Sequence, residues 1–529
     1  MTVRGYQLAA LWSRAGDYTG TLEDVSSYVL DSPDVVVEWG RSQPRATEDA
    51  KASTMTFALR NDGRQFSPEN ASSPIAGQVL TGTPTRLAVT DPANSTTTTV
   101  FGGPIATLDV DPTAAARDFT ATCSDGWAKP GATRISTPVY QGKRTGDLVQ
   151  IILDAIGWPS GDTYRRVDWG VTVVPYWWLE DVDAATAIND LVHSEGPPAC
   201  AWVQNGVFQF RARHHRVQLT ESLTSQGTYT HTIPAGAVPG DFKILAESFQ
   251  YSHGLDNIVN SATIEVTPRM PGAEQVVWST DGALMLGSGE TRSFILRTDD
   301  PFISMQVPDP TDGDYTLDSG SVSWSLSRDS GQSATLTMTG GGGGAVISTG
   351  LRVRATPLVA GPTQKFSTVN PDSQDTYGPS DWGGTAPWAY YYDAQAICDR
   401  VVSIYSQPRP SVTFDVEATL SSAGLTRALA TQLSDRITVR HDELGLNGDF
   451  FVEQVTHTVV QLGVRHIVTI GAQVVEPYQA AAPFIFDTAT PLANGFDHGQ
   501  FGLDSGVNPS SMFVFDTAGQ GFDQGVFAT

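Results

Sequence analysis

Short runs that alternate between apolar and polar residues fill the first quarter of the chain. Residues 119–123 alternate in this way, residues 35–39 and 86–90 are further short strand-like runs, and turns rich in glycine or proline separate such runs. A period of two places successive side chains on opposite faces of a strand. Evenly spaced short strands with turn residues between them are typical of small barrels and sandwiches. We therefore predict a small β-barrel or β-sandwich over residues 1–130.

The pattern changes to a helical period between residues 131 and 240. Thr145 and Asp183 each precede a run with apolar residues at every third or fourth position, which predicts two helices with these residues as N-caps. Gln204-Asn205-Gly206 separates two apolar runs and predicts a hairpin. Residues 131–240 are therefore predicted to form an α/β insert.

Strand patterns return in the second half of the chain. Residues 241–270 and 436–480 are predicted to form strands, and 271–360 an inserted sandwich-like β-domain. The five glycines at 340–344 are predicted to form the tip of a hairpin in that domain. Residues 361–435 are predicted as a loop and helical segment, with helices at about 393–405 and 421–434. The predicted fold class is mainly β with an α/β insert, in several domains.

The last segment, 481–529, contains two near copies of one pattern. F-x-F-D-T-A occurs at 484–489 and at 513–518, and each copy continues to a G-F-D segment. The alternating rings would expose a large apolar area unless a partner surface covered them. We predict that this tail docks on another subunit or another protein, and the alternative is an extra hairpin layer on its own chain. The predicted interface residues are Phe484, Phe486, Phe496, Phe501, Phe513, Phe515, Phe522 and Phe527.

The stretch from residue 54 to residue 89 has the most distinctive pattern in the chain. A strand pattern ends in Asn61-Asp62-Gly63, R-x-F-S-P-x-N-x-x-S-P-x-x-G follows, and Gly82-Thr83-Pro84 starts another strand. Later segments include CSDGW at 123–127 and FFVEQVTHTV at 450–459. This series resembles minor tail proteins of long-tailed phages of high-GC Gram-positive (actinobacterial) hosts, which are similar to tail-tip hub, or baseplate hub, proteins. The resemblance covers residues 1 to about 480.

The resemblance implies a structural virion protein of the tail tip rather than an enzyme. It implies two related barrels per chain, the first at residues 1–130 and the second at 241–270 with 436–480. It also implies a homotrimer, so that three chains present six barrels to a six-fold tail tube. The implied partners are distal tail and tail tube proteins, the tape-measure protein, and other tail-tip or receptor-binding proteins. The implied role is to link the tube to the tip and to form part of the DNA passage during genome ejection.

Composition limits the possible partners. The 529 residues include 32 basic and 57 acidic side chains, which gives a formal net charge of -25. Because binding to the DNA backbone relies on cationic groups, we expect DNA to pass without specific binding. No apolar run approaches the roughly 18 residues of a membrane span, and no signal peptide is apparent, so we expect synthesis in the host cytoplasm and no membrane insertion. The three cysteines are widely spaced and predict buried or free thiols.

Candidate catalytic groups do not form a recognised set. His214 and His215 lie among arginines that would repel a cation, while helix capping explains Asp183 without a glycosidase role. We therefore predict no catalytic residues, no cofactor and no metal. Two other classes stay open. Trp177 and Trp178 could contact a glycan, which would make this a carbohydrate-binding or carbohydrate-active tail protein. The other class is a distal-tail adaptor ring of six subunits.

Overall fold

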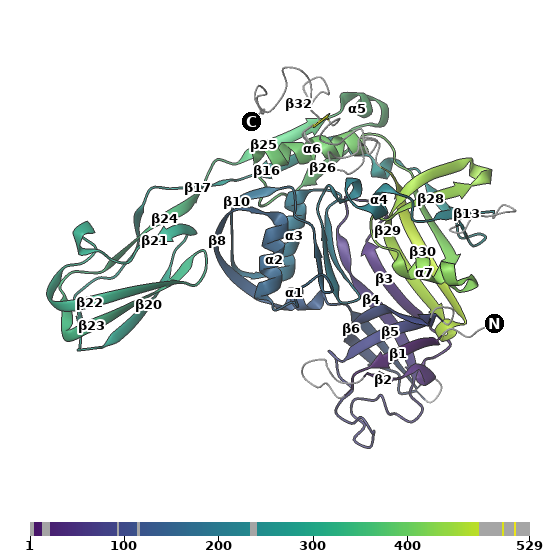
Figure 1. Cartoon of the computed structure of the whole chain (residues 1–529), viewed down its shortest axis with the longest axis horizontal. Helices are drawn as coiled ribbons and strands as arrows, with labels where there is room; N and C mark the ends of the chain where they lie inside the picture. The colour runs from purple at the N-terminus through teal and green to yellow at the C-terminus, as the bar shows by residue number, and fades with distance from the viewer. Residues whose placement is uncertain are drawn as a thin grey trace.

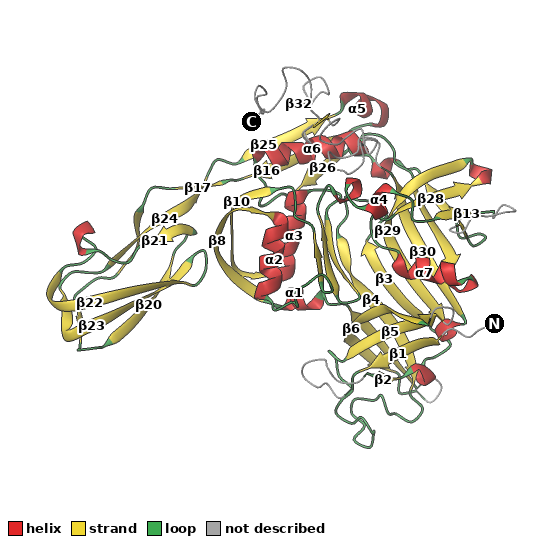
Figure 2. Cartoon of the chain, in the orientation of Figure 1, coloured by secondary structure: helices red, strands yellow, loops and turns green. Residues whose placement is uncertain are grey.

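The computed structural model describes residues 5–12, 22–91, 95–113, 117–232 and 241–475, and the backbone of 500–501 and 513–514. The chain is mainly β with an α/β insert, as predicted (Figure 2). A large sheet lies on one side of the molecule, the α/β insert lies in the middle, and a long β-arm projects away on the other side (Figure 1).

The first half of the large sheet comes from the N-terminal residues. Its strands lie in the order β3-β4-β7-β6-β5-β1-β2. Alternating residues of β4 and β7, such as Met55, Phe57 and Phe119, are buried, as the period of two predicts. The bounds are β1 (Gly5–Ala10), β2 (Glu23–Asp24), β3 (Val35–Arg41), β4 (Ala50–Arg60), β5 (Pro84–Asp91), β6 (Thr96–Val110) and β7 (Asp118–Ser124), with the 3-10 turn η1 at Ser26–Tyr28.

The second half of the sheet repeats this strand order. Its pairings run β15-β27-β30-β29-β28-β13-β14, so the six strands from β3 to β1 have six counterparts in the same chain order. One pair differs in direction, because β13 is parallel to β28 whereas β1 is antiparallel to β5. The bounds are β13 (Thr228–Thr230), β14 (Asp241–Lys243), β15 (Gln250–Ser252), β27 (Ser411–Glu417), β28 (Arg436–His441), β29 (Leu446–Val460) and β30 (Arg465–Val474).

The two halves share further details. Leu30 N–H donates to the Ala58 carbonyl at 3.0 Å, and in the second half Leu245 N–H donates to the Asp415 carbonyl at 2.8 Å. The long strands β6 and β29 are both 15 residues and are both bulged where they pair with the next strand. The connector between β4 and β5 has α7 (Ser422–Ala430) as its counterpart, and Phe66 and Leu425 from these two segments enter one continuous core.

The two halves form one continuous 14-stranded sheet because β3 pairs with β29. Each half also curls back on itself through a single antiparallel bridge, Val29 with Leu59 of β4 in the first half and Ile244 with Val416 of β27 in the second, so each half has the course of a small barrel within the shared sheet. Two strands also lie elsewhere than predicted. Strand β27 belongs to the large sheet rather than to a helical segment, and β16 (Ser261–Val266) pairs with β25 and β26 instead. Both placements depend on partners more than 50 residues away, which a local pattern does not reveal.

The α/β insert packs two helices side by side within curved strands (Figure 2). Asp183 caps α3 as predicted, since its carboxylate accepts from Thr186 N–H at 2.8 Å. Thr145 is instead the first residue of α2, and its hydroxyl donates to the Glu195 carboxylate. The bounds are α1 (Ala128–Ala132), β8 (Arg134–Arg144), α2 (Thr145–Ala155), β9 (Arg165–Val167), β10 (Val173–Asp183), α3 (Ala184–Glu195), β11 (Cys200–Gln204), β12 (Val207–Arg211), η2 (His215–Val217) and α4 (Thr220–Leu223).

A small sheet connects the arm to the rest of the chain. Helix α6 (Tyr391–Tyr405) packs on β16 and β25 (Gln364–Val369). Between β25 and α6 lie α5 (Pro371–Tyr377) and β26 (Asp381–Gly384), in a region predicted as loop. The arm contains two four-stranded sheets. Its strands are β17 (Arg269–Pro271), β18 (Gln275–Ser279), β19 (Leu284–Leu286), β20 (Thr291–Arg297), β21 (Phe302–Met305), β22 (Leu317–Arg328), β23 (Ser333–Ile347) and β24 (Arg352–Ala360).

The glycine run of the arm lies inside β23 rather than at a hairpin tip. A Cβ on Gly340 would lie 2.6 Å from the Gly287 carbonyl oxygen, and one on Gly344 would lie 2.5 Å from that of Leu286. The prediction of a hairpin tip is therefore wrong, because these glycines allow the backbone near β19 to approach β23 closely.

Candidate functional site at the joint between the two sheet halves

The joint is the antiparallel pairing of β3 with β29, two strands that lie about 400 residues apart in the chain. The register places Val35 opposite Val459 and Gly40 opposite Gln454. Gly40 has a φ of +112°, and a Cβ there would lie 2.6 Å from the Glu453 carbonyl oxygen. Only glycine fits both this backbone conformation and this close approach. The joint therefore depends on the identity of a single small residue.

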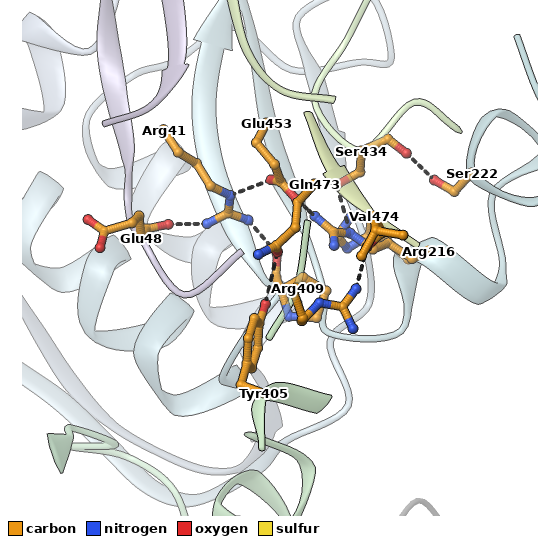
Figure 3. Close-up of polar contacts among 12 residues, drawn as sticks. Arg41, Glu48, Arg216, Ser222, Tyr405, Arg409, Ser434, Glu453, Gln473 and Val474 are labelled. Carbon is orange, nitrogen blue, oxygen red and sulfur yellow. Dashed lines mark hydrogen bonds and ion pairs between the residues drawn. The ribbon is translucent and has the colours of Figure 1, made fainter. Parts of the chain in front are cut away.

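A buried ionic cluster holds the joint at its bulged position. Glu453 lies in the bulge of β29 and is fully buried. Its carboxylate accepts from Arg41 Nε of β3 at 2.9 Å, and it also pairs with Arg216 of η2 (Figure 3). Removing one partner of a buried ion pair leaves an uncompensated charge, so each member depends on the others.

The same arginines bind the α/β insert to the large sheet. Arg41 Nη2 donates to the Pro198 carbonyl at 2.8 Å, and Arg41 also bonds to the Glu48 carbonyl (Figure 3). Arg216 Nε donates to Ser434 Oγ at 3.2 Å, and its guanidinium lies 4.5 Å from the centre of the Phe451 ring. Three parts of the chain therefore meet at one carboxylate: the first half, the insert and the second half.

A second buried group lies farther along the joint. The Trp39 and His457 rings are stacked with centroids 4.4 Å apart. His457 Nδ1 and His466 Nε2 are 2.7 Å apart, and Tyr6 Oη and His466 Nδ1 are 2.8 Å apart. Burial, and then the neighbouring His466, lowers the pKa of His457 well below its usual value. His457 is therefore neutral in the folded protein at neutral pH.

The face of the sheet that points away from the core is polar across the joint. Directly opposite residues on six neighbouring strands form one row: Asp415, Thr469, Thr456, Glu38, Thr54 and Ser124. All six side chains are exposed or half-buried, and Thr469 Oγ1 donates to Asp415 Oδ1 at 2.6 Å. The row holds two carboxylates and four hydroxyl groups and no basic residue. Such a surface repels phosphate rather than binding it.

The residues suggested for sugar binding do not form an open platform. Trp177 is fully buried in the core of the insert, whereas Trp178 is half-buried. The Trp178 and Trp388 rings are nearly perpendicular with centroids 5.2 Å apart, and the Arg269 guanidinium, from the base of the arm, lies 5.5 Å from the centre of the Trp178 ring. These neighbours give Trp178 a packing role between the insert and the arm.

The other candidate groups also have structural partners. His215 is buried and bonds to the Ala212 carbonyl at 2.6 Å, while Arg211 and Arg213 pair with Asp168 and Asp393. Among the described residues, no group of three or more His, Cys, Asp or Glu side chains could hold a metal ion. None of the helices in the described ranges is long and apolar enough to cross a bilayer.

Most of the predicted docking tail lies outside the described residues. Of its eight phenylalanines, the structure describes only the backbone of Phe501 and Phe513. These two residues pair in a short antiparallel ladder between β31 (Gln500–Phe501) and β32 (Phe513–Val514). The end of the first copy of the repeat therefore pairs with the start of the second copy.

Two cavities lie near the large sheet. One of about 160 Å³ lies between the Asp49 loop, the end of α3 and β26, where His193 Nε2 approaches Asp49 Oδ1 at 3.0 Å. The other, of about 270 Å³, lies beneath α7 and is lined by residues such as Tyr229 and Leu420. In the first cavity Thr385 Oγ1 lies 3.3 Å from His193 Nδ1, on the other side of the imidazole from Asp49, whereas the residues that line the second include no histidine or cysteine.

Sequence reasoning missed Glu453 and its two arginines. The local signal was a charged residue within FFVEQVTHTV, an otherwise alternating strand. A carboxylate at such a position implies a buried partner. The partners lie 412 and 237 residues away in sequence, so the pattern alone could not name them.

Comparisons with known proteins gave similarity only among solved structures. No protein-family model and no curated protein sequence matches the chain. The tail protein from Neisseria meningitidis MC58 is similar with a TM-score of 0.47 and 9% identity, over 91% of this chain and 99% of that chain. The prophage MuSo2 43 kDa tail protein from Shewanella oneidensis has a TM-score of 0.45 and 10% identity, over 89% and 98%. Prophage tail protein gp18 from Listeria monocytogenes EGD-e has a TM-score of 0.38 and 9% identity, over 88% and 94%.

Proposed function

We propose that this chain is a structural hub or baseplate minor tail protein at the tip of a phage tail. The observation that carries the proposal is the repeated strand order within one chain. Two halves with the same six-strand order are joined edge to edge through β3 and β29. A chain that contains two such units can match a six-fold tube with three copies.

The polar row at the joint supports a role in the DNA passage. Glu38 and Asp415 lie in a row that otherwise holds hydroxyl groups, and the whole chain has a net charge of -25. A lumen lined by such groups would let a polyanion pass without binding it. The neighbours in this arrangement are distal tail and tail tube proteins, the tape-measure protein, and receptor-binding or other tip proteins.

The β-arm projects away from the large sheet, and the α/β insert lies between the two (Figure 1). In the proposed ring they lie at the periphery, where they would contact the other tip components. The predicted docking tail with the phenylalanine repeats would add a further contact to a neighbouring subunit or tip protein.

Ring symmetry tests this function. Native mass spectrometry of the full chain, or cryo-electron microscopy of a particle tip, should give a trimer or a three-fold ring. A stable ring of six subunits, each contributing one sheet unit, would support the distal-tail adaptor instead.

Activity assays test the structural role. Incubation with peptidoglycan and polysaccharide should release neither reducing sugar nor free amine. Robust turnover that is lost on substitution of a single carboxylate would contradict the proposal.

The carbohydrate-binding alternative has its own test. Trp178→Ala is the informative substitution, since Trp177 is buried and its replacement would disturb the core. Glycan-array binding by the wild type that Trp178→Ala abolishes, with unchanged melting temperature, would favour that alternative.

Deletion of residues 481–529 tests the docking tail. Eight phenylalanine side chains would each contribute roughly 1.5–3 kcal/mol when buried. If the tail docks on a partner, the truncated subunit keeps its melting temperature and fails to assemble. If the truncated subunit is itself destabilised and assembly is otherwise normal, the tail folds on its own chain.

A further inference from the structure

The repeated strand order makes residues of one half correspond to residues of the other. Leu59 pairs with Phe119 in the first half, and Val416 pairs with Val468 in the second. The matching bonds from Leu30 to Ala58 and from Leu245 to Asp415 fix this alignment independently. Counting along the ladders from these anchors, β15 corresponds to residues 36–38 of β3, and residues 107–110 of β6 correspond to 454–457 of β29.

The corresponding edges differ in one respect. The outer edges of β3 and β29 cover each other in the joint. In the described part of the chain, no strand pairs with the outer edge of β15 or with that of β6 from residue 106 to 110. All three side chains of β15 are exposed, as are Ala106, Thr107 and Asp109. Each chain therefore contains one paired joint, β3 with β29. It also contains two unpaired edges, β15 and residues 106–110 of β6, which correspond to the two sides of that joint.

The chemistry of the open edges also matches the closed joint. In the joint, the carboxylate-bearing Glu38 lies opposite the hydroxyl-bearing Thr456. Their counterparts are Ser252 and Asp109, so a hydroxyl would again lie opposite a carboxylate, with the two roles exchanged. On the C-terminal side of this pair, Leu255 is 61% exposed, and Tyr251 is 44% exposed. A second copy of the chain would cover both apolar side chains.

We propose that β15 of one chain pairs antiparallel with β6 of another copy, in the register of the β3–β29 joint. Ser252 then lies opposite Asp109 and Tyr251 opposite Val110, and Gln250 continues the ladder next to Asp111. The contact is head-to-tail, so its repetition generates a ring if the rotation closes. This inference rests on the proposed function and names the edge, the partner and the register that the ring uses.

Disulfide trapping tests the register. Asp109→Cys combined with Ser252→Cys in the full chain should give, under mild oxidation, covalent dimers and trimers that a reducing agent dissolves. Directly opposite strand residues have Cβ atoms roughly 4.5–5.5 Å apart, close enough to be bridged. Glu38→Cys with Thr456→Cys is the matched control, because it should form a bridge within one chain and leave the mass unchanged.

Asp109→Cys with Gln250→Cys is the off-register control, because those residues would be diagonal and roughly 7–8 Å apart. The inference would be overturned if this pair formed covalent oligomers equally well. It would also be overturned if the Asp109→Cys/Ser252→Cys pair formed none while the internal control was bridged.

Hydrogen exchange of the unmodified chain gives a second measurement. Amides at 107–111 and 250–252 should exchange more slowly in the oligomer than in the monomer, and unchanged rates would contradict the pairing.

The outcomes separate this inference from the proposed function. A three-fold ring without the Asp109–Ser252 bridge would leave the tail-tip function intact and overturn only the register. A chain that forms no ring and is absent from purified tail tips would contradict both.

Discussion

The two halves of the large sheet have one strand order and two different sets of neighbours. In the first half, the edge strand β3 is covered by β29 and contains the buried residues Val35, Val37 and Trp39. In the second half, the corresponding strand β15 is short, and all its side chains are exposed. The comparison shows that strand order can recur while each edge is shaped by whether its partner lies in the same chain.

The contrast extends to how each edge is secured. The closed joint contains a fully desolvated carboxylate with two arginines, and a neutral histidine group beside it. A buried charge is strongly destabilising if it loses its partner, which suits a joint that forms once during folding. The open edges instead present hydroxyl, carboxylate and apolar side chains, which are stable in water before assembly.

Removing the shared carboxylate should give the largest effect. Glu453→Ala leaves Arg41 and Arg216 buried without their common partner, and breaking such a pair typically costs about 3–5 kcal/mol. We expect a large fall in melting temperature and faster hydrogen exchange in β3. The measurements are differential scanning fluorimetry and exchange mass spectrometry.

Glu417→Ala is the matched control for this change. Glu417 pairs with Arg465 at 3.1 Å, but the Arg465 side chain is 47% exposed. An exposed ion pair contributes about 0–1 kcal/mol. If the two variants lost similar stability, the buried cluster would not be what holds the joint.

A methyl group at Gly40 should have the next largest effect. Gly40→Ala must hold a side chain at a φ of +112° and also displace the Glu453 carbonyl, so we expect a loss of about 1–3 kcal/mol. Gly206→Ala is the control, since Gly206 has a φ of +81° in the β11–β12 turn with nothing within 4 Å of its Cβ position. Hydrogen exchange in β29 should rise only for Gly40→Ala. A rise of the same size in both variants would show that close packing at Gly40 is unimportant.

Local signals predicted much of the fold. The N-cap Asp183, the helical pattern from about residue 421 and the alternation at residues 119–123 indicated helices and a strand that the structure contains. The sequence did not predict which strands are neighbours. Strand β27 alternates Val412, Phe414 and Val416, yet its place between β15 and β30 depends on tertiary packing.

The joint was even less visible in the sequence. Its register depends on strands about 400 residues apart, and its glycine resembles any turn glycine until the Glu453 carbonyl is placed beside it. The phage-tail resemblance anticipated two related units in one chain but not the continuous sheet that joins them.

The buried histidine of the joint should make stability depend on pH. The pKa of His457 is lowered in the folded state, so the unfolded chain binds more protons than the folded chain below about pH 6.5. The stability that the neutral, buried His457 allows is fully present above that pH, and it is lost as the pH falls because burial opposes protonation of the ring. His457→Phe keeps a ring against Trp39 and should flatten the melting temperature between pH 5 and 7. His253→Gln, which changes an exposed histidine, should leave the slope unchanged, and equal slopes for the wild type and His457→Phe would contradict the prediction.

His193 should give the smallest effect, with the opposite sign. Its hydrogen bond to Asp49 raises the pKa of His193 above its usual value, and the charge of Asp49 adds to this. The pair therefore stabilises the fold fully below about pH 6.5, and this contribution is lost as the pH rises through the folded-state pKa. The side chains are 33% and 59% exposed, so water and salt screen the pair and its contribution should stay below about 1 kcal/mol.

Asp49→Asn should lower the titration midpoint of His193, followed by NMR of labelled histidine and assigned with His193→Gln, while the melting temperature changes little. A midpoint that stayed in place would show that the pair does not persist in solution. A large loss of stability would instead mean that the loop carrying Asp49 supports the joint through Arg41, which bonds to the neighbouring Glu48 carbonyl. His457 therefore reports on a joint from which water is excluded, and His193 reports on a surface contact that water weakens.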